Sequence, residues 1–546
     1  MAVIDTRRDQ MFPTLTPAQI EVATRFASGP ARTFAPGEIL YDVGERGTAG
    51  WLVLEGGIDV VRRDGLGHEA PIVTEGPGQF SGELNQLGGR ASIAAGRASP
   101  LGCTAVPFDA PHLRALVIGS AELGEMIMRA LILRRVGLIE SDNTGSILIG
   151  REDAPDLVRL RGMLDRNGYP NSVLDPVKDD EARALIERLG VPESDLPLMI
   201  CPNGTVLRRP TDAEAGVCLG LTPELDPDKV YDVAVVGAGP AGLATAVYAA
   251  SEGLSVIVLD ERAMGGQAGA SARIENYLGF PTGISGQALA GRAFSQAQKF
   301  GAELAIPLRV EALNCPDEAG GMLKLELEGG AKVQARTVVI ASGARYRRPD
   351  IKNLSTFEGA GISYWASPIE AKLCEGEEVA LVGGGNSAGQ AVAFLAPRVK
   401  KLHLIVRGEG LEASMSSYLI ERIAALPNVE LHTRTEIVAL HGERDTGLTG
   451  ATFRNRDGGA EKLCEMRHLF LFVGADPNTD WVRDCIDLDD KGFVLTGEGS
   501  DALATSRARV FAIGDARAGS TKRVAAAVGE GAAVVARIHA VLAEEA

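Results

Sequence analysis

The stretch that decides the fold of this 546-residue chain reads Val233-Ala234-Val235-Val236-Gly237-Ala238-Gly239-Pro240-Ala241-Gly242. Four apolar residues typical of a buried strand lead into a Gly-x-Gly-x-x-Gly turn, and a helix is expected from Leu243 to Ser251. A second strand, Val256 to Leu259, ends in Asp260 and Glu261. In such a βαβ unit the glycines let the backbone approach a pyrophosphate, the helix N-terminus attracts its charge, and an acid binds ribose hydroxyls. The sequence therefore predicts a dinucleotide-binding unit with the cofactor residues Gly237, Gly239, Pro240, Ala241, Gly242, Asp260 and Glu261.

A second unit of the same kind follows more than a hundred residues later. A strand from Glu378 to Val382 enters a glycine turn, a helix runs to about Leu395, and the next strand, Leu402 to Val406, ends in Arg407. An arginine in place of an acid favours a 2′-phosphate, so NADPH is expected over NADH. NADH stays open because Glu409 and Glu412 lie close by, and an exposed arginine without a ligand is the alternative. The predicted nucleotide residues are Gly383, Gly385, Asn386, Ser387, Ala388 and Arg407.

Further segments give residues 229 to 546 a resemblance to the low-molecular-weight thioredoxin reductases. These segments are Gly265-Gly266-Gln267, Ile274-Glu275-Asn276, Ala341-Ser342-Gly343, Phe511-Ala512-Ile513-Gly514-Asp515 and Lys522-Arg523-Val524. The resemblance implies a homodimer and a three-layer FAD-binding domain made of residues 229–346 and 474–546, with a nucleotide-binding domain, 347–473, inserted into it. It also implies that Gln267 and Asn276 bond the isoalloxazine and that Asp515 accepts from the ribityl chain, although each amide alone could be a loop cap. The FAD residues added in this way are Gly266, Gln267, Asn276, Ser342, Gly343, Gly514, Asp515, Lys522, Arg523 and Val524.

The chain departs from that family at its redox centre. In the family a Cys-x-x-Cys pair follows the segment that corresponds to 361–364, but here the two cysteine positions are Trp365 and Pro368. Neither side chain can attack a disulfide, so no catalytic residue is assigned. If the domain motion of the family persists, Trp365 would face the isoalloxazine and shield or orient it. The nearest cysteine, Cys374, is expected to be an inert core residue.

The cysteines show no clustered or metal-ligand spacing. They are Cys103, Cys201, Cys218, Cys315, Cys374, Cys464 and Cys485. An odd number without such a pattern predicts a reducing, intracellular setting, no structural disulfides and no metal site.

Residues 1–140 predict a small β-roll, because short β-type runs alternate with glycines and a helical tail covers about 110–137. The order resembles cyclic-nucleotide-binding domains, in which Gly82, Glu83 and Leu84 would hold the ribose and Arg90 the cyclic phosphate. The loop between them is shorter than usual. The sequence leaves open whether cAMP, cGMP or no nucleotide binds; without one, the β-roll would be a docking or dimerisation module.

Residues 144–222 resemble a thioredoxin or glutaredoxin fold. The pattern alternates strands and helices, and Leu196-Pro197 begins a strand where that fold has a cis proline. Such folds place a reactive cysteine at the start of the first helix, where this chain has Glu152 and Asp153. The predicted strands are 146–150, 172–175, 196–201 and 206–208, and the predicted helices are 156–167, 180–189 and one from Asp212. Residues 226–229 are the expected linker into the FAD domain.

Composition restricts the function further. A formal net charge of −17 with 23% charged residues predicts a surface that repels nucleic acid and anionic lipid. The charged start of the chain and the lack of a long apolar run predict a cytoplasmic protein without a membrane anchor.

The expected activity is that of a FAD-dependent NAD(P)H oxidoreductase. Hydride would pass from NADPH to FAD and on to a non-disulfide acceptor, namely a protein electron carrier, a quinone or oxygen. The alternative is a flavin-containing redox or cyclic-nucleotide sensor with little turnover. A true thioredoxin-disulfide reductase would need a dithiol that the sequence does not show.

Overall fold

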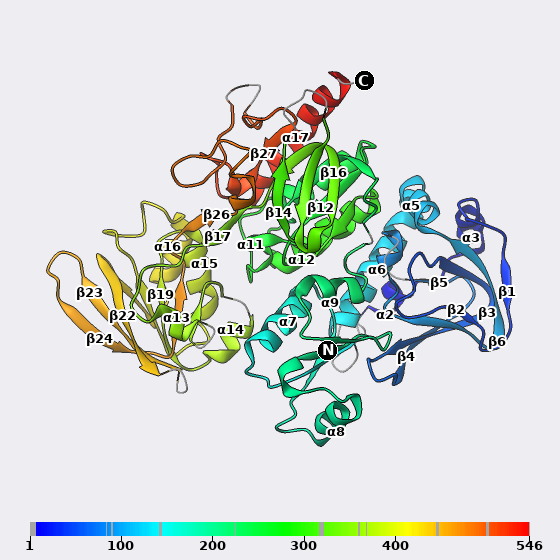
Figure 1. Ribbon diagram of the computed structural model, residues 1–546, viewed down its shortest axis with the longest axis horizontal. Helices are drawn as coiled ribbons and strands as arrows, with labels where there is room; N and C mark the ends of the chain where they lie inside the picture. Colours follow the sequence, from blue (N-terminus) through cyan, green and yellow to red (C-terminus); the bar gives the residue numbers. More distant parts are fainter. Residues whose placement is uncertain are drawn as a thin grey trace.

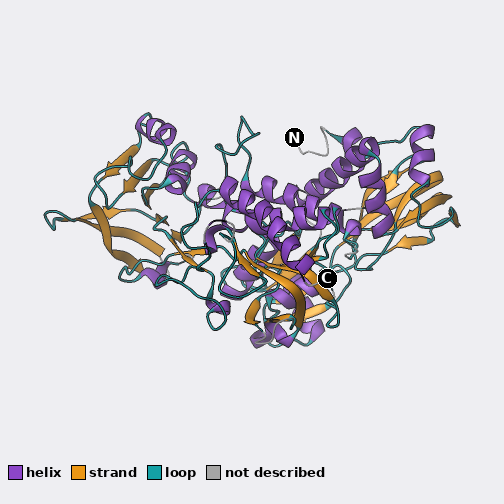
Figure 2. Ribbon diagram, turned by 90° about the horizontal axis from the view of Figure 1, so that it is seen from above, coloured by secondary structure: helices purple, strands orange, loops and turns teal. Residues whose placement is uncertain are grey.

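The structure is a computed structural model that describes residues 7–82, 84–88, 91–140, 145–223, 225–315, 321–358, 361–366, 368–443, 447–497, 499 and 502–544. Its strands form six sheets, which the colours of Figure 1 follow from the N-terminus to the C-terminus. Figure 2 shows sheets at both ends of the molecule and helices along its middle.

The first sheet is antiparallel and comes from the N-terminal quarter of the chain. Leu52 and Phe108 of this sheet pack against Leu116 and Leu123 of two following helices in one apolar cluster. The predicted helical tail is confirmed and strands are present, but β3 and β6 are each 14 residues long rather than short. The strands are β1 Arg32–Phe34, β2 Ile39–Tyr41, β3 Gly50–Arg63, β4 Glu69–Glu75, β5 Phe80–Ser81 and β6 Ala95–Phe108; the helices are α2 Arg8–Met11, α3 Pro17–Thr24, α4 Leu84–Leu87, α5 Ala110–Gly119 and α6 Ala121–Glu140.

The predicted cyclic-nucleotide residues lie at the turn before α4. Gly82 has φ +142°, a conformation that favours glycine, and Leu84 is the first residue of α4. Glu83 and Arg90, predicted to hold ribose and phosphate, lie outside the described residues. Nucleotide binding by this region therefore stays a prediction.

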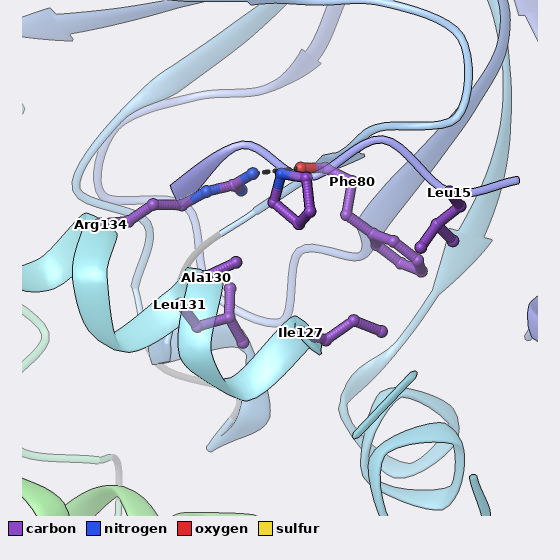
Figure 3. Close-up of a pocket in the computed structure, with 7 residues that line it drawn as sticks. Leu15, Phe80, Ile127, Ala130, Leu131 and Arg134 are labelled. Atoms are coloured by element: carbon purple, nitrogen blue, oxygen red, sulfur yellow. Dashed lines mark hydrogen bonds between the residues drawn. The ribbon is translucent and has the colours of Figure 1, made fainter. Parts of the chain in front are cut away.

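A buried ion pair joins α6 to the sheet. The Arg134 guanidinium lies 3.0 Å from the Glu75 carboxylate and donates to the backbone carbonyls of Met11, Gly82 and Phe80 at 2.7–3.0 Å. Only 1% of the Glu75 side chain is exposed, and burial raises its pKa while Arg134 opposes the rise. Figure 3 shows Arg134 beside a small cavity. The cavity is lined by Pro13, Leu15, Phe80, Ile127, Ala130, Leu131 and Arg134.

The second sheet has the order β10-β9-β7-β8, with β7 and β8 parallel and the other two neighbouring pairs antiparallel. The predicted strands and helices of residues 144–222 are confirmed, as is the cis bond between Leu196 and Pro197. Glu152 and Asp153 lie just before the first helix, as expected. The strands are β7 Ser146–Ile149, β8 Asn171–Leu174, β9 Leu198–Ile200 and β10 Val206–Arg208; the helices are α7 Pro155–Arg166, α8 Asp180–Leu189, η1 Glu193–Asp195 and α9 Asp212–Cys218.

Two disulfides contradict the expectation that the chain has none. Cys201, after β9, is bonded to Cys218 of α9, and Cys315 is bonded to Cys485. Their Cα atoms lie 6.6 and 6.2 Å apart, within the usual range for disulfides. The partners are separated by 17 and 170 residues, so only the folded chain brings them together.

The third sheet, with seven strands, has the order β13-β12-β11-β16-β15-β14, and β27 pairs in parallel with β16. Its apolar strands and the helices α10, α12 and α17 form one core. Because β27 comes from near the C-terminus, two distant parts of the chain share this sheet, as Figure 1 shows. Its strands are β11 Val230–Val236, β12 Val256–Leu259, β13 Glu303–Ala305, β14 Val310–Asn314, β15 Leu323–Leu327, β16 Lys332–Ile340 and β27 Val510–Ala512; its helices are α10 Pro240–Ser251, α11 Gly266–Gly269, α12 Gly286–Lys299, η2 Glu328–Gly330, η5 Gly514–Ala516 and α17 Val524–Glu544.

A parallel five-stranded sheet with the order β18-β25-β19-β20-β21 lies between these two parts of the chain in sequence. The helix α15 packs on one of its faces, and the antiparallel sheet β22-β23-β24 packs on the other. The strands are β18 Ile362–Ser363, β19 Glu378–Val382, β20 Lys401–Ile405, β21 Val429–His432, β22 Thr435–Glu443, β23 Gly447–Asn455, β24 Glu461–Glu465 and β25 His468–Leu471; the helices are α13 Leu354–Phe357, α14 Pro368–Leu373, α15 Asn386–Leu395 and α16 Ser417–Ala424.

Two short antiparallel strands connect the two nucleotide-type units. The chain leaves through β17, Ala344–Tyr346, and returns through β26, Ala475–Pro477, which is followed by η3, Asp480–Val482. The two crossings are therefore hydrogen-bonded to each other.

The helix α17 is long and apolar enough to cross a membrane, which was not expected from the sequence. One face of α17 is buried, and the Thr245 hydroxyl of α10 donates to the Gly531 carbonyl at 3.2 Å. The apolar residues on that face of α17 therefore pack into the core of the third sheet.

We predict that Arg134→Ala destabilises the N-terminal domain by about 3–5 kcal/mol, because it leaves the buried Glu75 carboxylate without its cation. Urea unfolding followed by the fluorescence of buried Trp51 measures the effect. Arg129→Ala is the matched control, because Arg129 lies on the same helix and pairs with Glu125 at the surface. Equal midpoints for the two variants would contradict a structural role of the buried pair.

Candidate functional site

The first glycine turn is tightly packed on one side and open on the other. A Cβ on Gly237, whose φ is +113°, would lie 2.1 Å from the Ala341 carbonyl oxygen, and a Cβ on Gly242 would lie 1.9 Å from that of Gly237. Gly239 is the N-cap of α10, and a Cβ built there would meet no atom within 4 Å. The turn therefore leaves room for a ligand at the helix N-terminus, where Pro240 and Ala241 begin the first turn of α10.

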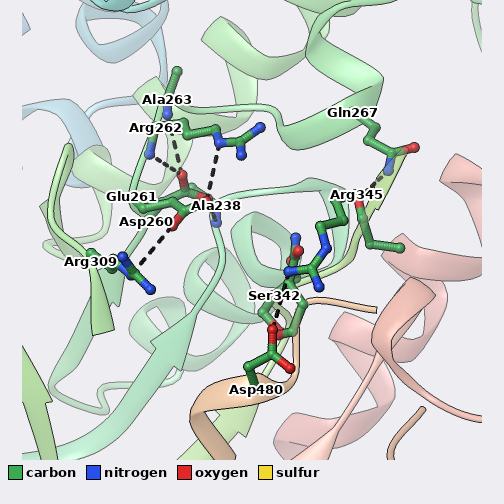
Figure 4. Close-up of polar contacts among 12 residues, drawn as sticks. Ala238, Asp260, Glu261, Arg262, Ala263, Gln267, Arg309, Ser342, Arg345 and Asp480 are labelled. Atoms are coloured by element: carbon green, nitrogen blue, oxygen red, sulfur yellow. Dashed lines mark hydrogen bonds and ion pairs between the residues drawn. The ribbon is translucent and has the colours of Figure 1, made fainter. Parts of the chain in front are cut away.

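The two acids after β12 have different surroundings, as Figure 4 shows. The Asp260 carboxylate accepts from the backbone N–H groups of Ala238, Arg262 and Ala263 at 2.8–3.2 Å, which fixes the glycine turn against the end of β12. Glu261 is exposed and forms ion pairs with Arg262 and Arg309 at 3.1 and 3.9 Å. Asp260 thus shapes the turn, and Glu261 is the acid that faces solvent.

Predicted flavin residues also meet at the end of β16. The Gln267 side chain donates to the Ala344 carbonyl, and the Ser342 hydroxyl donates to the Asn478 carbonyl at 2.6 Å. The Asn478 amide donates back to the Ser342 carbonyl at 3.1 Å. Gly343 has φ +65° with no atom within 4 Å of a built Cβ, and Gly266 has φ +52°. These bonds fix the segment where the chain leaves the third sheet.

Asn276 is exposed, and its neighbour Glu275 connects the two nucleotide-type units. The Glu275 carboxylate accepts from Arg422 of α16 at 2.7 Å. This contact could not be foreseen from the sequence, because Arg422 has no local motif around it.

The segment after β27 carries Asp515 within η5. Burial raises the pKa of Asp515, and the nearby Lys522 opposes the rise. Lys522 donates to the Asp515 carbonyl at 2.9 Å, while the Gly514 N–H donates to the Glu530 carboxylate at 2.6 Å. Glu530, on α17, is a positioning residue that sequence reasoning missed. Arg523 and Val524 stand at the start of α17, as predicted.

These residues fit FAD. The open space at Gly239 and Gly343, the free N-terminus of α10 and the exposed Glu261 match the pyrophosphate and ribose chemistry of a dinucleotide.

The second glycine turn repeats this design. A Cβ on Gly383, with φ +150°, would lie 2.7 Å from the Phe472 carbonyl oxygen, whereas Gly385 is the open N-cap of α15. The Asn386 side chain accepts from the Ser416 N–H at 2.7 Å and so fixes the turn rather than facing a ligand. Ser387 follows in the first turn of α15, and Ala388 is buried against the core.

Arg407 is exposed at the end of β20, where the sequence placed it. Glu409 had left NADH open as the nucleotide. Its carboxylate is paired with Arg434 at 2.6 Å. A second guanidinium, that of Arg456, donates to the Arg407 carbonyl at 3.5 Å. Arg456 was missed because it lies on the loop after β23, about fifty residues away in sequence. Arg456 is also paired with Glu436 at 3.8 Å, so it is the exposed Arg407 guanidinium that suits an anionic phosphate here.

The sequence predicts that Trp365 and Pro368 stand where the family has its dithiol. The Trp365 side chain is 40% exposed, and its indole N–H donates to Glu370 at 2.9 Å. Pro368 begins α14, and its side chain lies outside the described residues. Cys374 is wholly buried, which raises the pKa of its thiol to about 11 and confirms the expected inert residue.

The Pyridine nucleotide-disulphide oxidoreductase model matches residues 231–531. The chain belongs to this family. Its homologues are FAD-dependent oxidoreductases, and those of the thioredoxin reductase type use FAD and NADPH, which confirms the predicted enzyme class and cofactors at the level of the family.

Similar proteins agree with this membership over the same half of the chain. Thioredoxin reductase of Mycoplasmopsis pulmonis is 33% identical over 310 residues, 56% of this chain and 95% of that protein. NADPH-dependent thioredoxin reductase 3 of Arabidopsis thaliana is 33% identical over 307 residues, 55% of this chain, and the match spans only 56% of that longer relative. The crystal structure of T. acidophilum thioredoxin reductase has 28% identity and a TM-score of 0.53, covering 57% of this chain and 99% of that one. The N-terminal 230 residues lie outside the family match.

We predict that Gly242→Ala lowers FAD affinity at least tenfold, about 1.4 kcal/mol, because the new Cβ would push α10 away from the turn. The ratio of flavin to protein absorbance after reconstitution with FAD measures the loss. Gly291→Ala, in α12 with no atom near the built Cβ, is the control and should retain FAD. Full flavin content in both variants would contradict the assigned turn.

Proposed function

We propose that this chain is a FAD-dependent NAD(P)H oxidoreductase that reduces an acceptor other than a disulfide. The proposal rests on one observation: two glycine turns suited to dinucleotides are retained, whereas Trp365 and Pro368 stand at the positions of the family dithiol. When bound, FAD would accept a hydride from the nicotinamide and release electrons singly or in pairs.

The contribution of the chain is binding and orientation. The N-terminus of α10 and Gly239 would hold the pyrophosphate and Glu261 would bind the ribose, while Asp260 keeps the turn in shape. Lys522 and the start of α17 place positive charge beside Asp515, which favours an anionic ring edge. In the second unit, Gly385 and Arg407 hold the pyrophosphate and the 2′-phosphate of NADPH.

The acceptor is proposed as a small oxidant or a protein electron carrier. A thiol relay has no sulfur at the two family positions, and the buried Cys374 does not form a thiolate at neutral pH. Cytoplasmic placement is a further proposal that rests on composition, whereas a homodimer and cyclic-nucleotide binding at the N-terminal domain are proposals that rest on the resemblances alone. If the N-terminal domain binds cyclic nucleotides, calorimetric titration with cAMP or cGMP should release or absorb heat. No heat with either nucleotide would rule out that proposal.

Anaerobic mixing of the FAD-loaded protein with NADPH tests the enzyme activity. Rapid loss of the oxidised flavin absorbance, followed by recovery when a quinone or oxygen is added, is the expected result. A flavin that stays oxidised would rule out the reductase and favour the sensor with little turnover.

We predict that Arg407→Ala raises KM for NADPH at least tenfold and leaves KM for NADH unchanged, because only NADPH carries the 2′-phosphate. Steady-state rates with both nucleotides and a fixed quinone concentration provide the measurement. Arg398→Ala, an exposed arginine just after α15, is the control. A parallel loss with NADPH and NADH would show that Arg407 does not read the phosphate.

A further inference from the structure

Two histidines and a glutamate meet in the nucleotide-binding unit, on the face of the five-stranded sheet that is turned towards β22-β24. His403 lies on β20, and Glu430 and His432 lie on β21, where Glu430 is directly paired with His403 and His432 with Ile405. Alternation along the two strands places all three side chains on one face. That face is opposite to the one on which α15 packs. The cluster therefore lies on the opposite face of the sheet from α15, the helix that begins at the second glycine turn.

The three potential ligand atoms are spaced like one face of a metal tetrahedron. His403 Nδ1 lies 3.0 Å from His432 Nε2, and each nitrogen faces its own oxygen of Glu430: His403 Nδ1 lies 3.6 Å from Oε2 and His432 Nε2 lies 3.6 Å from Oε1. Tetrahedral zinc has metal–ligand distances near 2.0–2.1 Å, which places its ligands about 3.3 Å from each other. The separations are within a few tenths of an ångström of this value, and rotation of the Glu430 carboxylate would present one oxygen to both imidazoles.

The surroundings of His403 match those of a metal-ligating histidine. Only 5% of its side chain is exposed, and its second ring nitrogen, Nε2, lies 3.5 Å from the Cys464 thiol and 3.9 Å from the Glu378 carboxylate. A ligating imidazole commonly donates its other N–H to such an acceptor, which fixes the ring orientation. The Phe453 ring of β23 packs edge-on against both imidazoles, at 5.9 Å from His403 and 5.4 Å from His432.

The site is open to solvent on one side, and the cations Lys401 and Lys462 lie near it. The Glu430 side chain is 44% exposed and accepts from Lys401 at 2.6 Å. A divalent cation would displace this half-exposed ammonium, whose side chain can turn into solvent. Three protein ligands with an exposed side leave a fourth position for water.

We propose that His403, Glu430 and His432 form a binding site for a divalent first-row transition metal of the zinc type. The ligands come from two adjacent strands, and the residues beside them belong to β19, β23 and β24. A bound cation would therefore join the adjacent strands β20 and β21 on the face that β22-β24 covers. The site would stabilise the nucleotide-binding unit without taking part in electron transfer. The sequence predicted no metal, because ligands 29 residues apart on two strands show no local motif.

Calorimetric titration of the chelator-treated, FAD-loaded full chain with zinc chloride tests this proposal. One zinc ion per chain is expected, with a rise in Tm. His432→Gln and Glu430→Gln should each weaken zinc binding about 10–100-fold. Both changes are conservative and lie at partly exposed positions, and retained flavin content verifies the fold of each variant.

His441→Gln is the matched control, because His441 lies on the neighbouring β22 and bonds Thr452 instead of the cluster. It should bind zinc like the unchanged protein. The proposal is overturned if the unchanged chain shows no stoichiometric binding. It is also overturned if the cluster variants bind zinc as well as His441→Gln does.

Discussion

The close approach of backbone to backbone at the first glycine turn is the constraint on which the flavin site depends. Gly237 and Gly242 let β11, β16 and α10 meet at distances that any side chain would prevent. Asp260 then fixes the turn through three backbone N–H groups, and α17 packs against α10 through Gly531. This packing sets the position of Asp515. It also sets the position of the α10 N-terminus, which would attract the pyrophosphate.

Local sequence predicted the elements that carry their own periodicity or turn chemistry. Neighbouring residues were enough to infer the βαβ units around Gly237 and Gly383 and the strands and helices of residues 144–222. They were also enough to infer the burial of Cys374. In each case the determining interactions lie within about one supersecondary unit. Site residues assigned from family resemblance, such as Gln267 and Ser342, are held instead by bonds to distant segments.

Contacts between distant segments could not be inferred in this way. These contacts join residues that no motif connects. They are the disulfide Cys315–Cys485, the pair Glu275–Arg422, the hydrogen bond from Gly514 to Glu530 and the cluster at His403. The expected absence of disulfides was wrong for this reason, since an odd cysteine count says nothing about which residues the fold brings together. The apolar run of α17 was overlooked as well, and one face of this helix packs into the core of the third sheet.

The central claim is that electrons enter the flavin of this protein and leave it without passing through sulfur. Anaerobic titration with NADPH, followed by a count of free thiols by alkylation and mass spectrometry, tests it directly. The account predicts that a single equivalent of NADPH per FAD completes the reduction and that the number of free thiols stays the same. Consumption of a second equivalent together with the appearance of two new thiols, from Cys201–Cys218 or Cys315–Cys485, would contradict it.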